Sequence, residues 1–405
     1  MLEGLKVIEF ATYVAAPGAG GILADWGADV VKIEPINGDP IRSFFATLGA
    51  TEELGNPVFE MDNRGKRSVA LDTSTDEGRD VLYKLVADAD VFLTNVRPGG
   101  LERSQLDWPS LKTINPRLIY ASVSGYGLEG EERDRAGFDI AAFWSRSGVG
   151  RLTTPKGQTP MPIRTASGDH TTSLATVSGI LAALHERQKS NKGRLVETSL
   201  LRTGIYSISS DMAIQLRFGR VASTRPREAA ANPIGNYFQT QDGTWICIVP
   251  RQGNVDWPKL ANVIGRPELA DDERFANSKA RRANAVELIG LIDAEFAKYD
   301  LDTMGSKLDA EDLVWAPVQN AAQVAADPQA HAAGAFVDVP KEDGSGTFKS
   351  LAGPVRFRNE PEEGGGTADG PKGPAPSLGQ HTDDVLREAG IDDAQIATLK
   401  ASKII

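Results

Sequence analysis

The chain opens with Leu5-Lys-Val-Ile-Glu-Phe10, an apolar run of the length and composition of a buried β-strand. A glycine-bearing turn into a helical run, Ala15-Ala-Pro-Gly-Ala-Gly-Gly-Ile-Leu23, follows it, and a second strand pattern covers Asp29 to Ile33. A strand, a helix and a strand in this order predict a βαβ unit. The opening therefore indicates an α/β fold.

The glycines of this turn have two interpretations. Gly18 and Gly20 match the first two glycines of the dinucleotide-binding fingerprint, but Leu23 occupies the place of the third. The incomplete motif equally fits a tight strand-to-helix turn with close packing, without any ligand.

Further strand-like runs at Ser68 to Leu71, Val91 to Asn95 and Leu118 to Ser122 alternate with helix-like runs at Asp76 to Ala87 and Trp108 to Ile114. This alternation predicts a doubly wound, mainly parallel, Rossmann-like sheet. In such sheets ligands bind beyond the carboxyl ends of the strands. The segments expected there are Val14 to Pro17, Leu71 to Ser74, Asn95 to Gly99 and Ser124 to Tyr126.

The composition changes near Arg220, where a polar, turn-rich stretch precedes strand patterns near Tyr237 to Thr240 and Thr244 to Val249. Amphipathic helical patterns follow as far as about Leu308. We predict a large domain over residues 1–222, a smaller α+β domain over 223–330 and a C-terminal segment over 331–405. Within that segment a Gly- and Pro-rich connector (364–377) precedes two short helix patterns.

Charge and composition exclude several classes of protein. The formal net charge of −11 argues against a nucleic-acid binder, which needs clustered Lys and Arg for phosphate contacts. The sequence has no run of about 18 consecutive apolar residues, so no membrane span is expected. The N-terminus enters a strand pattern at once, without the charged and apolar regions of a signal peptide, and we expect a cytoplasmic protein.

Cysteine and metal-ligand patterns are equally sparse. The single cysteine, Cys247, excludes an intramolecular disulfide framework and a cysteine-based structural zinc site. It lies in the apolar run Trp245-Ile-Cys-Ile-Val249, which is typical of a packed core. His, Asp and Glu show no clustering at metal-ligand spacing, so we expect no metal.

A second informative stretch runs from Pro162 to His185 and delivers Asp169 onto the start of a long helix. Apolar residues recur there at three- and four-residue spacing, as on a buried helix face. At a helix start, unpaired N–H groups and the helix dipole favour an ionised carboxylate, which would make Asp169 available as a nucleophile. The alternative is a plain helix cap, the commonest use of Ser, Thr and Asp at such positions.

This stretch, together with Gly193-Arg-Leu-Val-Glu197, resembles the segment of family III CoA-transferases that carries the nucleophilic aspartate. That family includes formyl-CoA:oxalate and carnitine CoA-transferases. Other segments resemble it in order along nearly the whole chain. They are Leu5-Lys-Val-Ile-Glu-Phe10, Trp26-Gly-Ala-Asp-Val-Val-Lys-Ile-Glu34, Asn63-Arg-Gly-Lys-Arg-Ser68, Asn95-Val-Arg-Pro-Gly99, Asn115-Pro-Arg-Leu-Ile-Tyr120 and Leu378-Gly-Gln-His-Thr382.

The resemblance implies a fold and an activity. The implied fold is a large Rossmann-like domain to which the C-terminal part returns, a small domain, and two chains interlocked as a homodimer. The implied activity is transfer of CoA from an acyl-CoA thioester to a carboxylic acid, with no cofactor beyond CoA as substrate. α-Methylacyl-CoA racemases share the scaffold and are the alternative. A noncatalytic NAD- or CoA-binding regulator is a third hypothesis, and Asp169 on a ligand-facing helix start argues against it.

The resemblance also implies site residues, with Asp169 as the catalytic one. The expected CoA contacts are Val14, Ala15, Leu71, Thr73, Asn95, Val96, Arg97, Arg103, Phe138 and Asp139. Asn95 closes a strand before Pro98-Gly99 turns the chain away, so a ligand-facing loop is also what the residues themselves indicate. For Arg97 and Arg103 simple surface charge is the alternative.

The sequence departs from the oxalate enzyme at three places. Pro35 follows Glu34 where that enzyme has an arginine, and Val14 replaces its active-site glutamine. Its glycine-rich run, which closes over the acyl-aspartyl intermediate, is replaced by Ala229-Ala-Ala-Asn-Pro-Ile-Gly235. Oxalate is therefore not an expected substrate.

Phe138 separates transferase from racemase. Racemases that resemble this chain have a histidine at this place, which works with the aspartate as a second base on the α-proton. Phenylalanine cannot transfer a proton. His170 follows Asp169 directly, but one residue along a helix points about 100° away, so we expect it beside the site rather than in it.

Overall fold

The computed structural model describes residues 1–44, 55–164, 166–360 and 369–405. The chain forms two compact units, each described here by itself. The large unit contains Met1–Gly150, Met161–Arg220 and Ala333–Ile405, and the small unit contains Arg151–Pro160 and Val221–Ala332. Residues 151–160 thus belong to the small unit, whereas the division expected from the sequence kept them within residues 1–222.

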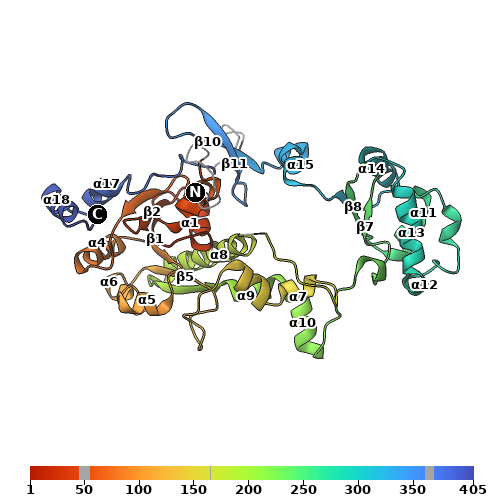
Figure 1. Ribbon diagram of the computed structural model, residues 1–405. Coiled ribbons are helices and arrows are strands. Elements are labelled where there is room, and N and C mark those ends of the chain that lie inside the picture. The colour runs from red at the N-terminus through yellow and green to blue at the C-terminus, as the bar shows by residue number, and fades with distance from the viewer. Residues whose placement is uncertain (45–54, 165, 361–368) are drawn as a thin grey trace. The chain divides into compact units, whose positions relative to one another are not determined.

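The large unit is built on a six-stranded parallel sheet with the order β3-β2-β1-β4-β5-β6 (Figure 1). The pairing is in register from Ile8 to both Val31 and Phe92, which makes β1 a central strand. The α/β, doubly wound architecture predicted from the sequence is confirmed. The strands are β1 (Lys6–Phe10), β2 (Asp29–Glu34), β3 (Arg67–Ala70), β4 (Val91–Thr94), β5 (Ile119–Ser124) and β6 (Arg194–Ser199).

Helices α1 (Ala15–Asp25) and α8 (Ser167–Ser190) pack together on one face of this sheet. Small residues make the approach of their backbones possible, because a Cβ on Gly18 would lie 2.7 Å from the Ser173 hydroxyl oxygen. The Ser173 hydroxyl also donates a hydrogen bond to the carbonyl of Ala15, at 2.6 Å. The start of α8 is therefore fixed directly against the start of α1.

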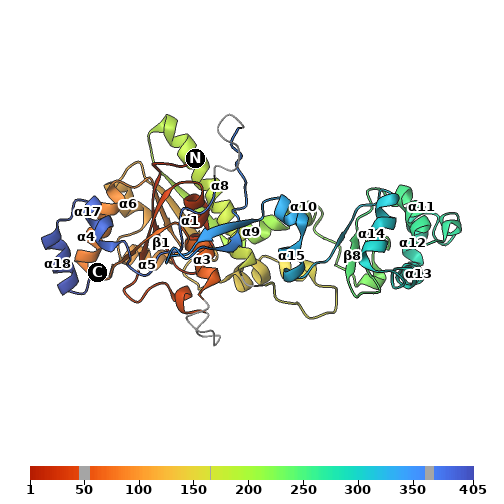
Figure 2. The same ribbon diagram turned by 90° about the horizontal axis from the view of Figure 1, so that it is seen from above.

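The other face of the sheet is covered by helices from two distant parts of the chain (Figure 1 and Figure 2). Residues of α4, α5 and α6 form one core there with residues of the C-terminal α17 and α18. These helices are α4 (Asp76–Ala87), α5 (Pro98–Arg103), α6 (Trp108–Ile114), α17 (Thr382–Glu388) and α18 (Asp393–Ala401).

The C-terminal segment also covers the edge of the sheet at β3. The backbone N–H of His381 donates to the carbonyl of Ser68 (3.0 Å), and the N–H of Ala70 donates to the Thr382 hydroxyl (3.1 Å). An exposed edge strand would offer its unpaired groups to other chains, so these bonds also protect the sheet. Of the predicted connector at 364–377, residues 364–368 lie outside the described residues.

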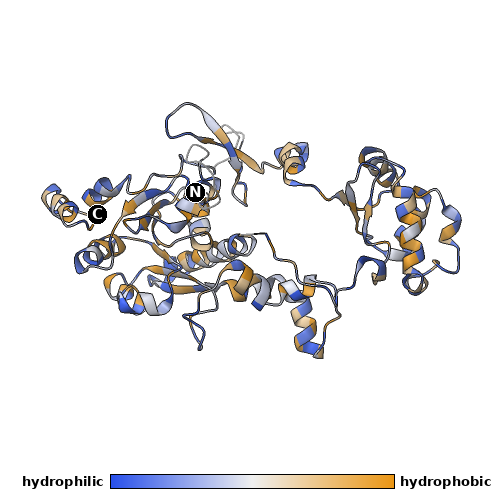
Figure 3. Ribbon diagram, viewed as in Figure 1, coloured by the Kyte–Doolittle hydropathy of each residue, from blue (hydrophilic) through white to orange (hydrophobic). Residues whose placement is uncertain are grey.

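The small unit has a three-stranded antiparallel sheet, β7 (Tyr237–Gln239), β8 (Trp245–Ile248) and β9 (Trp315–Pro317). It has its own core, which includes Phe238, Trp257 and Phe296. Apolar residues are concentrated along α13 (Figure 3). Its helices are α11 (Gly253–Val263), α12 (Ser278–Ala283), α13 (Ala285–Phe296), α14 (Leu301–Ala310), α15 (Ala321–Ala326) and α16 (Pro328–Ala332), with 3₁₀ turns η4 (Arg227–Ala229) and η5 (Pro267–Ala270).

The remaining elements complete the two units. None of the helices among the described residues combines the length and apolar character needed to cross a membrane. These elements are η1 (Pro40–Ser43), α3 (Pro57–Asn63), the π-helical η3 (Asp139–Arg146), α7 (Val149–Thr153), α9 (Leu200–Ser207), α10 (Ser209–Phe218), β10 (Phe336–Pro340) and β11 (Thr347–Leu351).

Candidate active site

A cavity of about 380 Å³ lies at the carboxyl ends of β1, β4 and β5. Strands β1 and β4 are neighbours in the sheet, although the chain passes through β2 and β3 between them. Their loops separate there, and such a switch point is where open parallel sheets bind ligands. Thr12 and Asn95 tie the two loops together, because the N–H of Thr12 donates to Asn95 Oδ1 (3.0 Å) and Asn95 Nδ2 donates to the carbonyl of Thr12 (2.6 Å).

Asp169 lies in the lining of this cavity, as the third residue of α8. The N-cap is Ala166, which has no capping side chain and a left-handed φ of +71°. This conformation is unfavourable for a residue other than glycine, and it turns the chain into α8. Asp169 is thus not the N-cap of its own helix. Its carboxyl group is free to face the cavity.

The space around Asp169 is set by Gly168, which is buried. A Cβ on Gly168 would lie 2.5 Å from Cγ of Phe143 in η3, closer than packed atoms approach. Glycine therefore lets η3 pack against the first turn of α8. This contact brings Asp139, the first residue of η3, into the neighbourhood of Asp169.

The electrostatic surroundings of Asp169 differ from the sequence-based expectation. Burial raises its pKa to about 7, and the charge of Asp139 and, more weakly, that of Asp62 act in the same direction, whereas His170 opposes them. The helix start alone would favour the ionised form. Burial and two neighbouring carboxylates outweigh it, so about half of the Asp169 population is protonated at pH 7.

Phe138 and Tyr13 form an aromatic wall of the same cavity. Their ring centroids are 5.6 Å apart and their planes meet at 89°, an edge-to-face arrangement. Phe138 is 58% exposed, and its phenyl ring has no group that could exchange a proton with a substrate. The neighbouring Asp139 is buried, and among the described residues its Oδ2 has no hydrogen-bond partner.

The loop that carries Tyr13 is held from beneath by a buried cluster of charges. Asp39 Oδ1 accepts the N–H of Tyr13 (3.1 Å), and Asp39 Oδ2 lies 2.9 Å from Lys32 Nζ. Lys32 and Lys66 both donate to Glu9, at 3.0 and 2.6 Å, and the side chains of all three are fully buried. These contacts connect the ends of β1 and β2 to the cavity wall.

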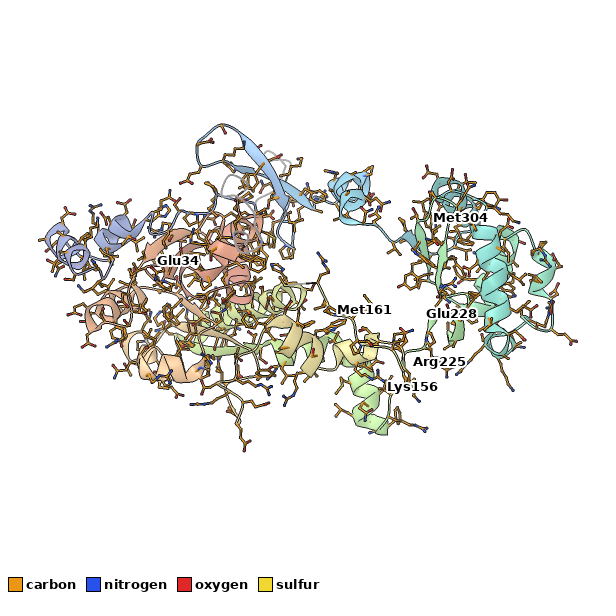
Figure 4. The ribbon with its side chains drawn as sticks, in the orientation of Figure 1. Glu34, Lys156, Met161, Arg225, Glu228 and Met304 are labelled. Atoms are coloured by element: carbon orange, nitrogen blue, oxygen red, sulfur yellow. The ribbon has the colours of Figure 1, made fainter. Side chains whose placement is uncertain are left out.

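Glu34, which is labelled in Figure 4, ends β2 and holds the loop that follows it. Its carboxylate accepts from Arg42 Nε (2.7 Å) and from the Ser68 hydroxyl (2.6 Å). Arg42, eight residues further along the chain, is thus a cationic partner of this carboxylate. Glu34 is buried and is not part of the cavity lining.

Three arginines, Arg97, Arg133 and Arg135, lie in the cavity lining. Arg133 is paired with Glu102 (2.8 Å), and Arg97 Nη1 donates to the carbonyl of Asp134 (3.3 Å). Guanidinium groups around a cavity are suited to phosphate oxygens. The sequence interpretation included Arg97 but missed the other two, although both stand just before the Gly137-Phe138-Asp139 segment.

The structure brings most of the expected site residues together. Those in the cavity lining are Val14, Ala15, Asn95, Val96, Arg97, Phe138 and Asp169. Four others are outside it. Leu71 is buried in the core beside α4, and Thr73, Arg103 and the buried Asp139 are not among the lining residues. Thr12, Tyr13 and Leu200 also line the cavity and were not among the predicted residues.

Among the described residues, no three His, Cys, Asp or Glu side chains are grouped as metal ligands would be.

Residues 2–382 match the model of CoA-transferase family III. The chain belongs to this family. It is a CoA-transferase, an enzyme class that acts on acyl-CoA and carboxylate substrates.

Three known proteins that are similar to this chain are the following. (R)-2-hydroxy-4-methylpentanoate CoA-transferase from Clostridioides difficile is 34% identical over 100% of this chain and 99% of its own length. Succinate–glutarate CoA-transferase from Agrobacterium fabrum is 34% identical over 96% of this chain and 95% of its own. The crystal structure of a CaiB/BaiF family protein from Brucella suis has a TM-score of 0.81 at 32% identity, covering 96% of this chain and 99% of that one.

Proposed function

We propose that this enzyme moves CoA from an acyl-CoA thioester to an acceptor carboxylic acid with Asp169 as the nucleophile. The observation that carries the proposal is the position of Asp169 in the wall of the switch-point cavity, whose lining also contains three arginines suited to the phosphates of CoA. A family III match along nearly the whole chain supports it.

In the first half of the reaction an Asp169 carboxylate oxygen attacks the thioester carbonyl. The carbon–sulfur bond breaks, giving a mixed anhydride and CoA thiolate. The thiolate then attacks the aspartyl carbonyl of the anhydride and releases the donor carboxylate, which leaves an aspartyl-CoA thioester. The acceptor carboxylate runs both steps in reverse and regenerates Asp169. Each step develops an oxyanion, which backbone N–H groups near Asp169 would stabilise.

Burial of the Asp169 carboxyl group suits this chemistry. The raised pKa shows that the site disfavours the anionic carboxylate, and both covalent intermediates are uncharged at this residue. Formation of the anhydride therefore relieves the repulsion from Asp139. CoA is the only cofactor-like molecule in the scheme, so dialysis against a chelator should leave the rate unchanged.

The names of the relatives point to hydroxy acids and dicarboxylic acids as substrates. A screen of acyl-CoA and carboxylate pairs by mass spectrometry would identify the donor and the acceptor. Oxalate is not expected among them, since Val14 stands where the oxalate enzyme has its glutamine. We also propose a homodimer, which light scattering tests. A stable, active monomer would contradict it.

The nucleophile is tested by intact-protein mass spectrometry after incubation with acyl-CoA. The wild-type protein should gain the mass of CoA less one water, and hydroxylamine should remove it. Asp169→Ala should show neither the adduct nor turnover, with folding and CoA binding largely kept. Asp80→Ala, at an exposed position on α4, is the matched control and should behave as wild type. Turnover above a trace in purified Asp169→Ala would refute the assignment.

A further inference from the structure

His170, the residue after Asp169 on α8, contacts a second acidic residue, Asp62. Asp62, on α3, is buried with a side-chain exposure of 3%, and its Oδ1 lies 3.1 Å from His170 Nε2. The His170 side chain is 38% exposed. The two residues are 108 positions apart in the chain, so this contact exists only in the folded protein.

Helix α1 leaves room for the pair because it presents a glycine to it. A Cβ on Gly18 would lie 3.4 Å from both Asp62 Oδ1 and His170 Cδ2. Nearby, a Cβ on Gly21 would lie 2.8 Å from the carbonyl oxygen of Asp62. The geometry of the contact is therefore set by three packed helices and not by one mobile side chain.

His170 and Asp169 face different cavities. Asp62 and His170 line a cavity of about 280 Å³, together with residues of α1 and with the segment from Leu351 to Pro354. Asp169 lines the switch-point cavity, and His170 is not part of that lining. His170 is thus not placed to exchange a proton with a substrate bound beside Asp169. Its influence there is through charge.

The charged groups near these residues come from several elements. Asp169 is influenced by Asp139 of η3, Asp62 of α3 and its neighbour His170, while the arginines of the cavity rim are engaged with Glu102, Glu132 and Asp134. In the second cavity, Arg64 and Asp25 are paired with each other at 2.5 Å. Of the three described residues whose charges act on Asp169, Asp139 and Asp62 are carboxyl groups and His170 is the basic one.

We propose, on the basis of the proposed function, that Asp62 is a positioning residue that keeps His170 in its imidazolium form. The cation in turn keeps part of the Asp169 population ionised and ready to attack the thioester. The directions of the pKa shifts agree with this. For His170, burial lowers the pKa, but the hydrogen bond and charge of Asp62, together with smaller contributions from Asp169 and the Ala166 backbone, raise it overall. For Asp169, His170 is the one neighbour that lowers the pKa.

The test is the pH profile of kcat/KM for the full-length enzyme, which reports groups of the free enzyme. Asp62→Asn keeps an acceptor for His170 but removes the charge, so His170 becomes neutral at a lower pH. His170→Gln removes the cation and leaves the Asp62 carboxylate in place. The acid limb should therefore move upward most in His170→Gln, by about 0.5 to 1 pH unit. In Asp62→Asn the upward shift should be smaller, because losing the Asp62 charge, which itself raises the pKa of Asp169, partly offsets the loss of the cation. Asp80→Asn is the control and should not move it.

If Asp62 and His170 had a purely structural role, the variants would have a lower kcat at every pH, and the acid limb of the pH profile would not move. That result would overturn the proposal. An independent readout is histidine NMR, which is tractable because the chain has four histidines. The resonance lost in His170→Gln should titrate at lower pH in Asp62→Asn, and an unchanged midpoint would also overturn the proposal. Turnover by Asp169→Ala would instead refute the nucleophile assignment, so the two failures are distinguishable.

Discussion

Replacing Asp169 by Asn should stabilise the fold at pH 8, even though it removes the proposed nucleophile. The reason is that the folded state raises the pKa of this carboxyl group from 3.8 to about 7. Between these values the folded protein holds a proton that the unfolded chain releases. The free energy of unfolding of the wild type therefore falls as pH rises from about 4 to about 7.

The size of the effect follows from the shift. The difference of 7 − 3.8 is about 3 units, and at about 1.4 kcal/mol per unit it amounts to about 4 kcal/mol. Asp169 faces a solvent-connected cavity, and screening there reduces the value, so we expect about 2 kcal/mol. Asn cannot ionise. The variant should consequently exceed the wild type by this amount at pH 8 and match it near pH 4.

The assay is urea unfolding of both proteins at pH 4.5, 6 and 8. One protein concentration is used throughout, because the stability of the proposed homodimer would depend on concentration. Asp80→Asn serves as the control, since Asp80 is exposed and its replacement should change little at any pH. The reasoning is refuted if Asp169→Asn is no more stable than wild type at pH 8. It is also refuted if the gain is the same at all three pH values, because the gain would then not come from ionisation.

Three further outcomes are expected. Gly168→Ala should lower the free energy of unfolding by about 2 kcal/mol and remove much of the activity, since its Cβ would lie 2.5 Å from a ring atom of η3. Gly290→Ala, at an exposed helix position with no atom within 4 Å, should raise the free energy of unfolding by about 1 kcal/mol. Thermal unfolding compares the two variants. Glu9→Gln should cost about 3–5 kcal/mol in urea unfolding because it leaves Lys66 buried without its carboxylate. Incorporation of solvent deuterium at the α-carbon of a 2-methylacyl-CoA should be far slower than CoA transfer, because Phe138 supplies no second base. Rapid incorporation without CoA transfer would contradict this prediction.

Local sequence patterns were sufficient for most of the large sheet. The predicted helices at Asp76–Ala87 and Trp108–Ile114 have the bounds found in the structure, because each has apolar residues on one face and a clear start. Strand β6 was not predicted from its apolar pattern, and its segment was noted only for its resemblance to the family. Its residues are less buried than those of β1 and β4, so its apolar signal is weaker. Strand β9 is three residues long and gave no pattern at all.

The candidate site was predictable where function follows from a position along one segment. Asp169 at a helix start and Asn95 at a strand end are such cases, and both face the cavity. Leu71 also follows a strand, but its side chain points into the core beneath α4. The direction of a side chain after a strand depends on the pleat and the packing around it, which the segment alone does not show.

The sequence by itself determined the alternation of strands and helices, the family resemblance and the residue at the start of α8, because these are properties of short segments. Tertiary structure decided which segments meet. The strand order places Thr12 against Asn95, and the packing of α1, α3 and α8 places Asp62 against His170. It also decided the protonation of Asp169, since burial and the charges of Asp139 and Asp62 act across space and outweigh the local preference of a helix start.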